Sequence, residues 1–159
     1  MSQDLIDQIT EKLNENSFKL TTAESCTGGF LSTLITRKSG ASAIFDRGFI
    51  TYSNASKTEL LGVPEETINT HGAVSPETAE AMAKGALKNS EADLSISITG
   101  IAGPSGGTDD KPVGLVYFGF ALKGGSSGSI KETFTGDRHD IQNQAAKKAL
   151  KNLLEILSE

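Results

Sequence analysis

Residues 93–122, DLSISITGIAGPSGGTDDKPVGLVYFGFAL, decide the predicted fold, because two strand patterns follow each other here with no helix between them. Apolar and polar residues alternate over 93–99, and 113–122 is a nearly continuous apolar run, so both segments are typical of strands. The segment between them is rich in glycine and long for a simple hairpin loop. The absence of a crossover helix predicts that the two strands are antiparallel.

Outside this stretch, strand patterns and helix patterns alternate along the chain. Strands are expected over 18–23, 44–53 and 130–136, and helices over 1–16, 30–38, 54–62, 75–92 and 140–159. This order predicts an α/β fold, a three-layer α/β/α sandwich around a mixed, largely parallel sheet with an antiparallel portion in the second half. The length of 159 residues predicts a single domain over residues 1–159.

Two of the predicted helices carry clear end signals. Ser75 followed by Pro76 and by acidic residues in the first turn is typical of a helix start. Asn54 is expected to cap the helix over 54–62, and Gly62 to end it.

Bulk composition limits the possible partners. The formal net charge is −5, so no nucleic acid and no membrane is expected as a partner, and an anionic ligand needs a local positive pocket. The chain has one cysteine, an acidic amphipathic N-terminal segment and no apolar run as long as a membrane span. These features predict a soluble cytoplasmic protein.

Metal and histidine-based sites find little support. The two histidines, His71 and His139, do not form a paired motif, and the single cysteine has no partner at zinc-site spacing. We therefore expect no metal site and no cofactor. The small number of histidines also argues against a Ser-His-Asp or Cys-His catalytic site. Both histidines are interpreted as exposed loop residues.

The glycine-rich stretch GIAGPSGG, residues 100–107, has two interpretations. It lacks the Lys-Ser/Thr ending of a phosphate-binding P-loop, and its spacing differs from the dinucleotide fingerprint. It could be an ordinary surface turn, in which glycine and proline set the backbone angles. However, it follows a predicted strand, and open α/β sheets bind ligands beyond the carboxyl ends of their strands.

The stretch TTAESCTGG, residues 21–29, follows another strand in the same way. A helix starting near 26–27 would present free backbone amides that suit an anion or an oxyanion. From the residues alone three roles stay open: Ser25 as nucleophile, Cys26 as nucleophile, or Ser25 as a helix cap.

A serine nucleophile needs a base, and TYSNASK, residues 51–57, supplies Tyr52 and Lys57. A lysine acts as a base only when burial or nearby positive charge lowers its pKa, and a tyrosine hydroxyl can relay a proton beside it. The alternative is an exposed lysine beside a half-buried tyrosine. Arg138 is a candidate anion clamp or an ordinary solvated arginine at a helix start.

Read together, the motifs resemble those of the CinA C-terminal domain family, whose members include nicotinamide mononucleotide deamidases. The matching segments occur in order over nearly the whole chain: TTAESCTGG, FDRGFITYSNASK, GVPEETINTHGAVSPETAEAMAKGAL, SISITGIAGPSGG, KPVGLVYFGFA and FTGDRHDIQNQA. The resemblance implies a metal-independent amidohydrolase that converts nicotinamide mononucleotide to nicotinate mononucleotide and ammonia. It also implies a homodimer or a larger homo-oligomer.

The resemblance assigns roles to individual residues. It makes Ser25 the nucleophile and adds Tyr52 and Lys57 as the rest of the catalytic group. As a mechanism we expect Lys57 to act as the base, with Tyr52 as a relay. The substrate-binding residues expected from the family and from the two strand-end loops are Thr27, Gly28, Gly29, Thr99, Gly100 and Arg138.

The additional domain of longer relatives and two alternative functions are considered separately. Many relatives carry a large additional N-terminal domain with pyrophosphatase activity, which we do not expect of these residues. The substrate could be another small carboxamide. The same loops could also belong to a non-catalytic nucleotide-binding module.

Overall fold

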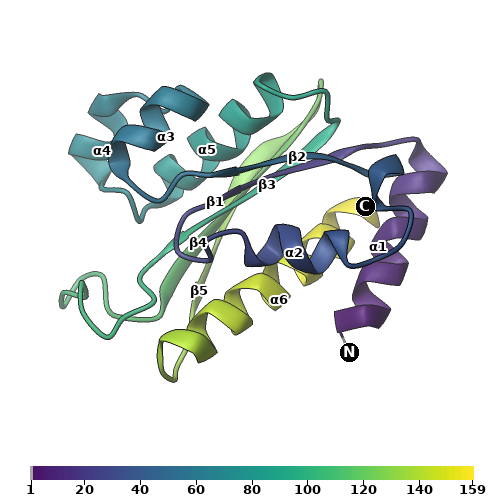
Figure 1. The fold of residues 1–159 in the computed structure, drawn as a ribbon. Helices are drawn as coiled ribbons and strands as arrows, with labels where there is room; N and C mark the ends of the chain where they lie inside the picture. The colour runs from purple at the N-terminus through teal and green to yellow at the C-terminus, as the bar shows by residue number, and fades with distance from the viewer. Residues whose placement is uncertain (1) are drawn as a thin grey trace.

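The computed structural model describes residues 2–159 and has a five-stranded sheet between two layers of helices (Figure 1). The strands are β1 (Leu20–Glu24), β2 (Phe45–Ile50), β3 (Leu94–Gly100), β4 (Leu115–Leu122) and β5 (Ser127–Thr133). The helices are α1 (Ser2–Asn16), α2 (Phe30–Thr36), α3 (Asn54–Leu61), α4 (Glu65–His71), α5 (Pro76–Lys88) and α6 (Arg138–Leu157), with a short 3-10 turn η1 (Ala41–Ala43). None of the helices within 2–159 combines the length and the apolar character needed to cross a bilayer.

The strand order is β2-β1-β3-β4-β5. Both pairings of β1, with β2 and with β3, are parallel, whereas β3–β4 and β4–β5 are antiparallel. The prediction of a mixed sheet with its antiparallel portion in the second half is therefore confirmed.

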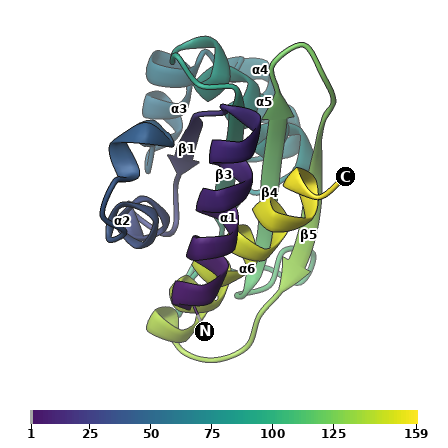
Figure 2. The same ribbon diagram turned by 90° about the vertical axis from the view of Figure 1, so that its right-hand side faces the viewer.

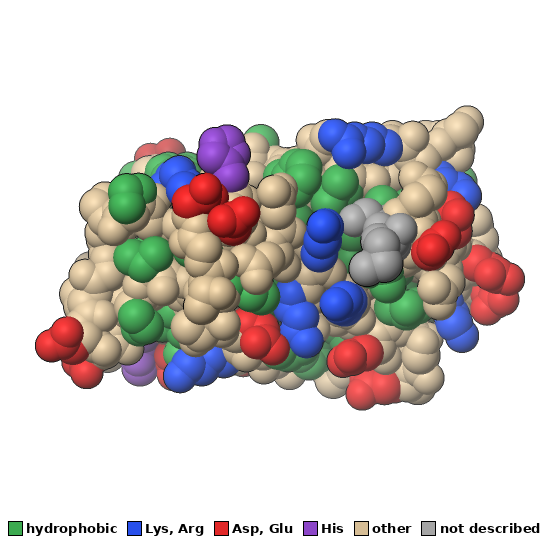
Figure 3. All heavy atoms as spheres, turned by 90° about the horizontal axis from the view of Figure 1, so that it is seen from below, with side chains coloured by type: hydrophobic (Ala, Val, Ile, Leu, Met, Phe, Trp, Pro, Cys, Tyr) green, Lys and Arg blue, Asp and Glu red, His purple; other side chains and the backbone are tan. Residues whose placement is uncertain are grey.

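The helices cover both faces of the sheet, which confirms the predicted three layers. Helices α1, α2 and α6 lie on one face, with α1 and α6 packed against each other (Figure 2), and α3, α4 and α5 lie on the other. The outer face of the first layer carries lysine and arginine side chains among aspartates and glutamates (Figure 3).

The alternating sequence of strand β3 matches the different surroundings of its two faces. Leu94, Ile96 and Ile98 are fully buried in the larger core, toward α1 and α6. The hydroxyls of Ser95 and Ser97 point the other way and donate to backbone carbonyls of α5. Both faces are buried, and the polar face is satisfied by hydrogen bonds, as buried hydroxyls require.

The helix-end predictions are partly correct. Ser75 caps α5 by accepting the Thr78 amide, and Gly62 ends α3 in the left-handed conformation. The cap of α3 is Ser53 and not the predicted Asn54, because the Ser53 hydroxyl accepts the Ser56 amide.

Two elements differ from the sequence-based expectation. Helix α4 was not predicted, and only Ile68 of its seven residues is buried, so it shows no apolar repeat to read. Strand β5 spans Ser127–Thr133, so it begins and ends three residues before the strand predicted over 130–136. It is an edge strand, which pairs with a neighbouring strand on one side only.

The register of the parallel strands brings their carboxyl ends together. Glu24 at the end of β1 lies opposite Ile50 of β2 and Ile98 of β3. The residues that follow β1 and β2, and the last residues of β3, therefore meet at one edge of the sheet.

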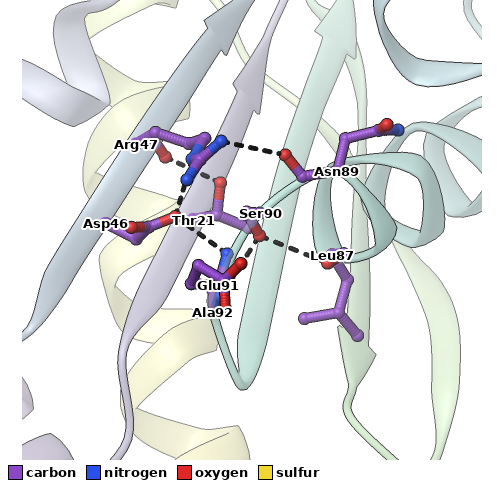
Figure 4. A network of polar contacts seen from close by, with 8 residues as sticks. All are labelled: Thr21, Asp46, Arg47, Leu87, Asn89, Ser90, Glu91 and Ala92. Carbon is purple, nitrogen blue, oxygen red and sulfur yellow. Dashed lines mark hydrogen bonds and ion pairs between the residues drawn. The ribbon is translucent and has the colours of Figure 1, made fainter.

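At the opposite end of the sheet, a polar network connects β2 to the loop before β3 (Figure 4). There the Asp46 carboxylate accepts the Glu91 amide, and Arg47 donates to the Asn89 carbonyl.

Candidate active site

A cavity of about 290 Å³ lies at the edge where the parallel strands end. Six of the predicted site residues line it: Ser25, Tyr52, Lys57, Thr99, Gly100 and Arg138. They come from separate parts of the chain, because Ser25 follows β1, Tyr52 and Lys57 follow β2, Thr99 and Gly100 end β3, and Arg138 begins α6.

Ser25 and Lys57 are in direct contact. The Lys57 Nζ atom lies 3.0 Å from the Ser25 Oγ atom, to which it donates a hydrogen bond. Ser25 is 8% exposed and Lys57 only 1% exposed. The hydroxyl and the amine therefore form a contact that is largely shielded from solvent.

Burial makes the neutral form of Lys57 more accessible than in an exposed lysine. Its Nζ atom donates to the backbone carbonyls of Thr51, at 2.8 Å, and of Tyr52, at 3.2 Å. Burial lowers the pKa of the Lys57 amine to about 8. When the amine is neutral, its two N–H bonds can serve these two carbonyls, and its lone pair can then accept the Ser25 hydroxyl.

Cys26 has the opposite environment. The thiol is buried, and burial raises its pKa to about 12, so it stays protonated at neutral pH. A protonated thiol is a weak nucleophile. This chemistry disfavours Cys26 relative to its neighbour Ser25.

Tyr52 and Arg138 form a bridge across the cavity. The Tyr52 side chain is 60% exposed, and its hydroxyl accepts a 2.9 Å hydrogen bond from Arg138 Nη2. Arg138 Nη1 donates to the Gly103 carbonyl at 2.7 Å. Among the described residues, Arg138 is the only hydrogen-bond partner of this hydroxyl. Lys57 contacts the carbonyl of Tyr52 and not its phenol, so the expected relay is not formed in this arrangement.

The end of β3 is closely packed. The Thr99 hydroxyl donates to the Ala73 carbonyl at 2.8 Å and so anchors the segment before α5 to the cavity wall. A Cβ atom on Gly100 would lie 2.9 Å from the Leu115 carbonyl oxygen. Only glycine fits this close approach of two strands without a shift of backbone.

The remaining predicted residues, Thr27, Gly28 and Gly29, lie in the turn behind the cavity and do not line it. Gly28 and Gly29 have φ angles of 58° and 104°, which favour glycine. The Thr27 hydroxyl donates to the Glu24 carboxylate at 2.6 Å. A role of these three residues in substrate binding stays a prediction.

The helix after this turn starts where the apolar pattern over 30–38 predicts, and not near 26–27 as the oxyanion interpretation requires. Helix α2 begins at Phe30, its N-cap position is Gly29, and Ser25 therefore does not cap it. The amides of Leu31 and Ser32, in the first turn of α2, donate to the Glu24 carboxylate. They are thus already occupied by a carboxylate of the protein itself.

Sequence reasoning missed two side chains behind the cavity wall. The Glu24 carboxylate is fully buried, and Gln142 of α6 donates from Nε2 to the Cys26 carbonyl at 3.0 Å. An acidic residue that ends a buried strand was a readable signal for Glu24. Gln142 gave no such signal, because one polar residue in a mixed helix is ordinary.

The sequence over residues 2–157 matches the CinA C-terminal domain family. With the fold and the cavity described above, the chain belongs to this family.

Curated relatives are similar over most of this chain. The nicotinamide-nucleotide amidohydrolase PncC of Escherichia coli strain K12 is 48% identical over 149 residues, which cover 94% of this chain and 90% of the relative. A putative competence-damage inducible protein of Caldicellulosiruptor bescii is 53% identical over 138 residues, which cover 87% of this chain. The present chain spans only 33% of that longer relative.

Solved structures share the whole fold. The competence/damage inducible protein CihA of Agrobacterium tumefaciens superposes with a TM-score of 0.95 and is 39% identical, covering 99% of this chain and 96% of that one. A CinA superfamily protein of Escherichia coli has a TM-score of 0.94 and is 34% identical, covering 98% and 90%.

Proposed function

We propose that this chain is a nicotinamide-nucleotide amidohydrolase that converts nicotinamide mononucleotide to nicotinate mononucleotide and ammonia. The observation that carries the proposal is the buried contact between Ser25 and Lys57, a hydroxyl beside an amine whose pKa is lowered to about 8. The name of the Escherichia coli relative supports this choice of substrate.

In the first step the neutral Lys57 amine takes the proton of the Ser25 hydroxyl. The Ser25 Oγ atom then bonds to the carboxamide carbon, and the carbonyl electron pair moves to oxygen. This oxyanion can be bound by a backbone amide that donates to no other described residue. The amide of Cys26, a residue that lines the cavity, meets this condition. Each such donor contributes about 3 kcal/mol in comparable sites.

The second step releases ammonia. The tetrahedral centre collapses, the C–N bond breaks, and the Lys57 ammonium returns its proton to the leaving nitrogen. A nicotinoyl ester on Ser25 remains. Water attacks this ester while Lys57 takes the proton of the water, and protonation of the departing Ser25 oxygen restores the enzyme.

Arg138 supplies the positive charge that an anionic substrate needs in a protein of net charge −5. Its guanidinium lies at the cavity and holds the Tyr52 hydroxyl. We assign Arg138 to substrate binding and Lys57 to proton transfer. The relay role of Tyr52 requires its hydroxyl to leave Arg138 when substrate binds.

The direct test is ammonia release by the purified protein from nicotinamide mononucleotide, free nicotinamide and the full dinucleotide. We expect turnover of the mononucleotide above the other two. Preference for a different small carboxamide would retain the chemistry and change the substrate. Binding of the mononucleotide with no ammonia release would instead indicate a non-catalytic module. The cytoplasmic location, the single-domain organisation and the homo-oligomeric state remain predictions.

A further inference from the structure

The turn of residues 25–29 is held by side chains that take no part in the proposed chemistry. On one side lies the Glu24 carboxylate. Its Oε1 atom accepts the Thr27 hydroxyl at 2.6 Å and the Leu31 amide at 2.9 Å. Its Oε2 atom accepts the Ser32 amide at 3.0 Å and the Ser32 hydroxyl at 2.6 Å.

This carboxylate is unusual in being fully buried while none of its hydrogen-bond partners within residues 2–159 is a cation. A buried carboxylate without an ion pair is costly unless hydrogen bonds replace its hydration. Here two amides and two hydroxyls do so, and one of the hydroxyls belongs to the turn. The carboxylate therefore joins β1, the 25–29 turn and the start of α2.

Glu24 also reaches the lysine through the backbone. Its carbonyl accepts the Thr51 amide at 2.9 Å, and the Thr51 carbonyl accepts Lys57 Nζ at 2.8 Å. One residue thus connects the turn that carries Ser25 with the segment that orients the amine.

On the other side the turn is held by α6. Gln142 lies one helical turn after Arg138, and its Nε2 atom donates to the carbonyl of Cys26 at 3.0 Å. The same helix therefore presents Arg138 to the cavity and holds the carbonyl of Cys26, the residue after Ser25.

We propose that Glu24 and Gln142 are positioning residues, which hold the 25–29 turn so that the Ser25 hydroxyl stays aligned with Lys57. This inference rests on the proposed function for its kinetic consequence. Small displacements of a reacting group reduce rate steeply, and a shift of about 1 Å can cost about 100-fold.

The first comparison uses two glutamines of α6. Gln142→Leu removes the bond to Cys26, whereas Gln144→Leu makes the same change at an equally half-buried site where the amide donates only to the Thr135 and Asp140 carbonyls. We expect kcat for nicotinamide mononucleotide to fall about 10- to 100-fold in Gln142→Leu with little change in KM. Gln144→Leu should keep the wild-type kcat.

The second comparison concerns the carboxylate. Glu24→Gln keeps the size of the side chain and replaces one acceptor oxygen with a donor, which faces either the Leu31 or the Ser32 amide. Ser32→Ala removes one bond to Glu24 on the α2 side and keeps the carboxylate. We expect a lower kcat in Glu24→Gln only, with thermal melting of each variant to verify folding. If Glu24→Gln does not fold, the comparison of Gln142→Leu with Gln144→Leu tests the proposal.

Amide hydrogen exchange of the 25–29 turn provides a readout that needs no substrate. We expect faster exchange there in Gln142→Leu and Glu24→Gln than in their controls. The inference is overturned if Gln142→Leu matches Gln144→Leu in both exchange and kcat, or if exchange rises while kcat is unchanged. A wild-type protein that releases no ammonia overturns the proposed function instead, and the exchange comparison then decides alone whether these side chains hold the turn.

Discussion

Lys57 is the residue on which the proposed chemistry depends, and its burial is the feature that sequence could least predict. Lysine is normally exposed, so a lysine on a short helix is ordinarily interpreted as a surface residue. The structure buries it because α3 packs against α5, and the Thr51 and Tyr52 carbonyls receive the amine. The candidates Ser25, Tyr52 and Lys57 were predictable, but their distances were not.

The rate should follow the titration of Lys57. Only the neutral amine accepts the proton of Ser25, and the pKa of Lys57 is lowered to about 8. We expect kcat/KM to rise with pH up to about 8 and to level off above it, because this parameter reports ionisations of the free enzyme. A pH profile of ammonia release from pH 6 to 10 measures this. A flat profile from 6 to 8 would remove Lys57 as the base.

At the scale of elements, strong local signals predicted helices and strands well, and weak ones did not. The helix start at Ser75 has a cap, a proline and an acidic first turn, and it is correct. Helix α4 buries only Ile68, so no periodic signal existed. The start of α2 at Phe30 agrees with the apolar pattern over 30–38, but the buried Glu24 carboxylate that accepts its first-turn amides is a contact that no local pattern reveals.

At Gly85, where α5 packs against α3, helix propensity and steric contact have opposite effects on the free energy of unfolding. Gly85→Ala should stabilise an isolated helix by about 1 kcal/mol, since glycine is a poor helix former. In the protein a Cβ atom at this position would lie 1.9 Å from the Leu61 carbonyl oxygen, which is backbone and cannot move freely. We therefore expect destabilisation of about 1 to 3 kcal/mol, as for other overpacked sites.

Urea unfolding of Gly85→Ala beside wild type measures this difference. Lys84→Ala serves as the control, because it changes the neighbouring position of the same helix at a largely exposed side chain. An increase in the free energy of unfolding of Gly85→Ala would show that helix propensity outweighs the contact with α3.

At the scale of the whole molecule, the mixed sheet could be predicted because it depends on element order, which composition and periodicity reveal. The interleaved first half predicted parallel pairing, and the two strands of 93–122 predicted the antiparallel pair. The site could be predicted only in part. Its residues come from four separate segments, and the sheet register brings them together.

Burial of Lys57 should also affect the stability of the whole protein. Its pKa is about 8 in the folded state and 10.5 in the absence of the protein environment. Between pH 8 and 10.5 the unfolded chain binds more protons than the folded protein, so the free energy of unfolding rises with pH. Below pH 8 the full cost of burying the charged amine lowers the stability of the folded protein. A shift of this size corresponds to about 3 kcal/mol in total.

The matched comparison is Lys57→Met, which lacks the titrating group. We expect the free energy of unfolding of wild type minus that of Lys57→Met to increase from pH 8 to 10.5, as measured by urea unfolding across this range. A difference that is independent of pH would mean that Lys57 keeps an ordinary pKa in the folded protein.

The central claim is that Ser25, and not Cys26, attacks the carboxamide. The most direct measurement is ammonia release from nicotinamide mononucleotide by Ser25→Ala and Cys26→Ala, both verified as folded. We predict that Ser25→Ala loses activity, and that Cys26→Ala retains it because the buried thiol stays protonated. Retained activity in Ser25→Ala together with lost activity in Cys26→Ala would contradict the account.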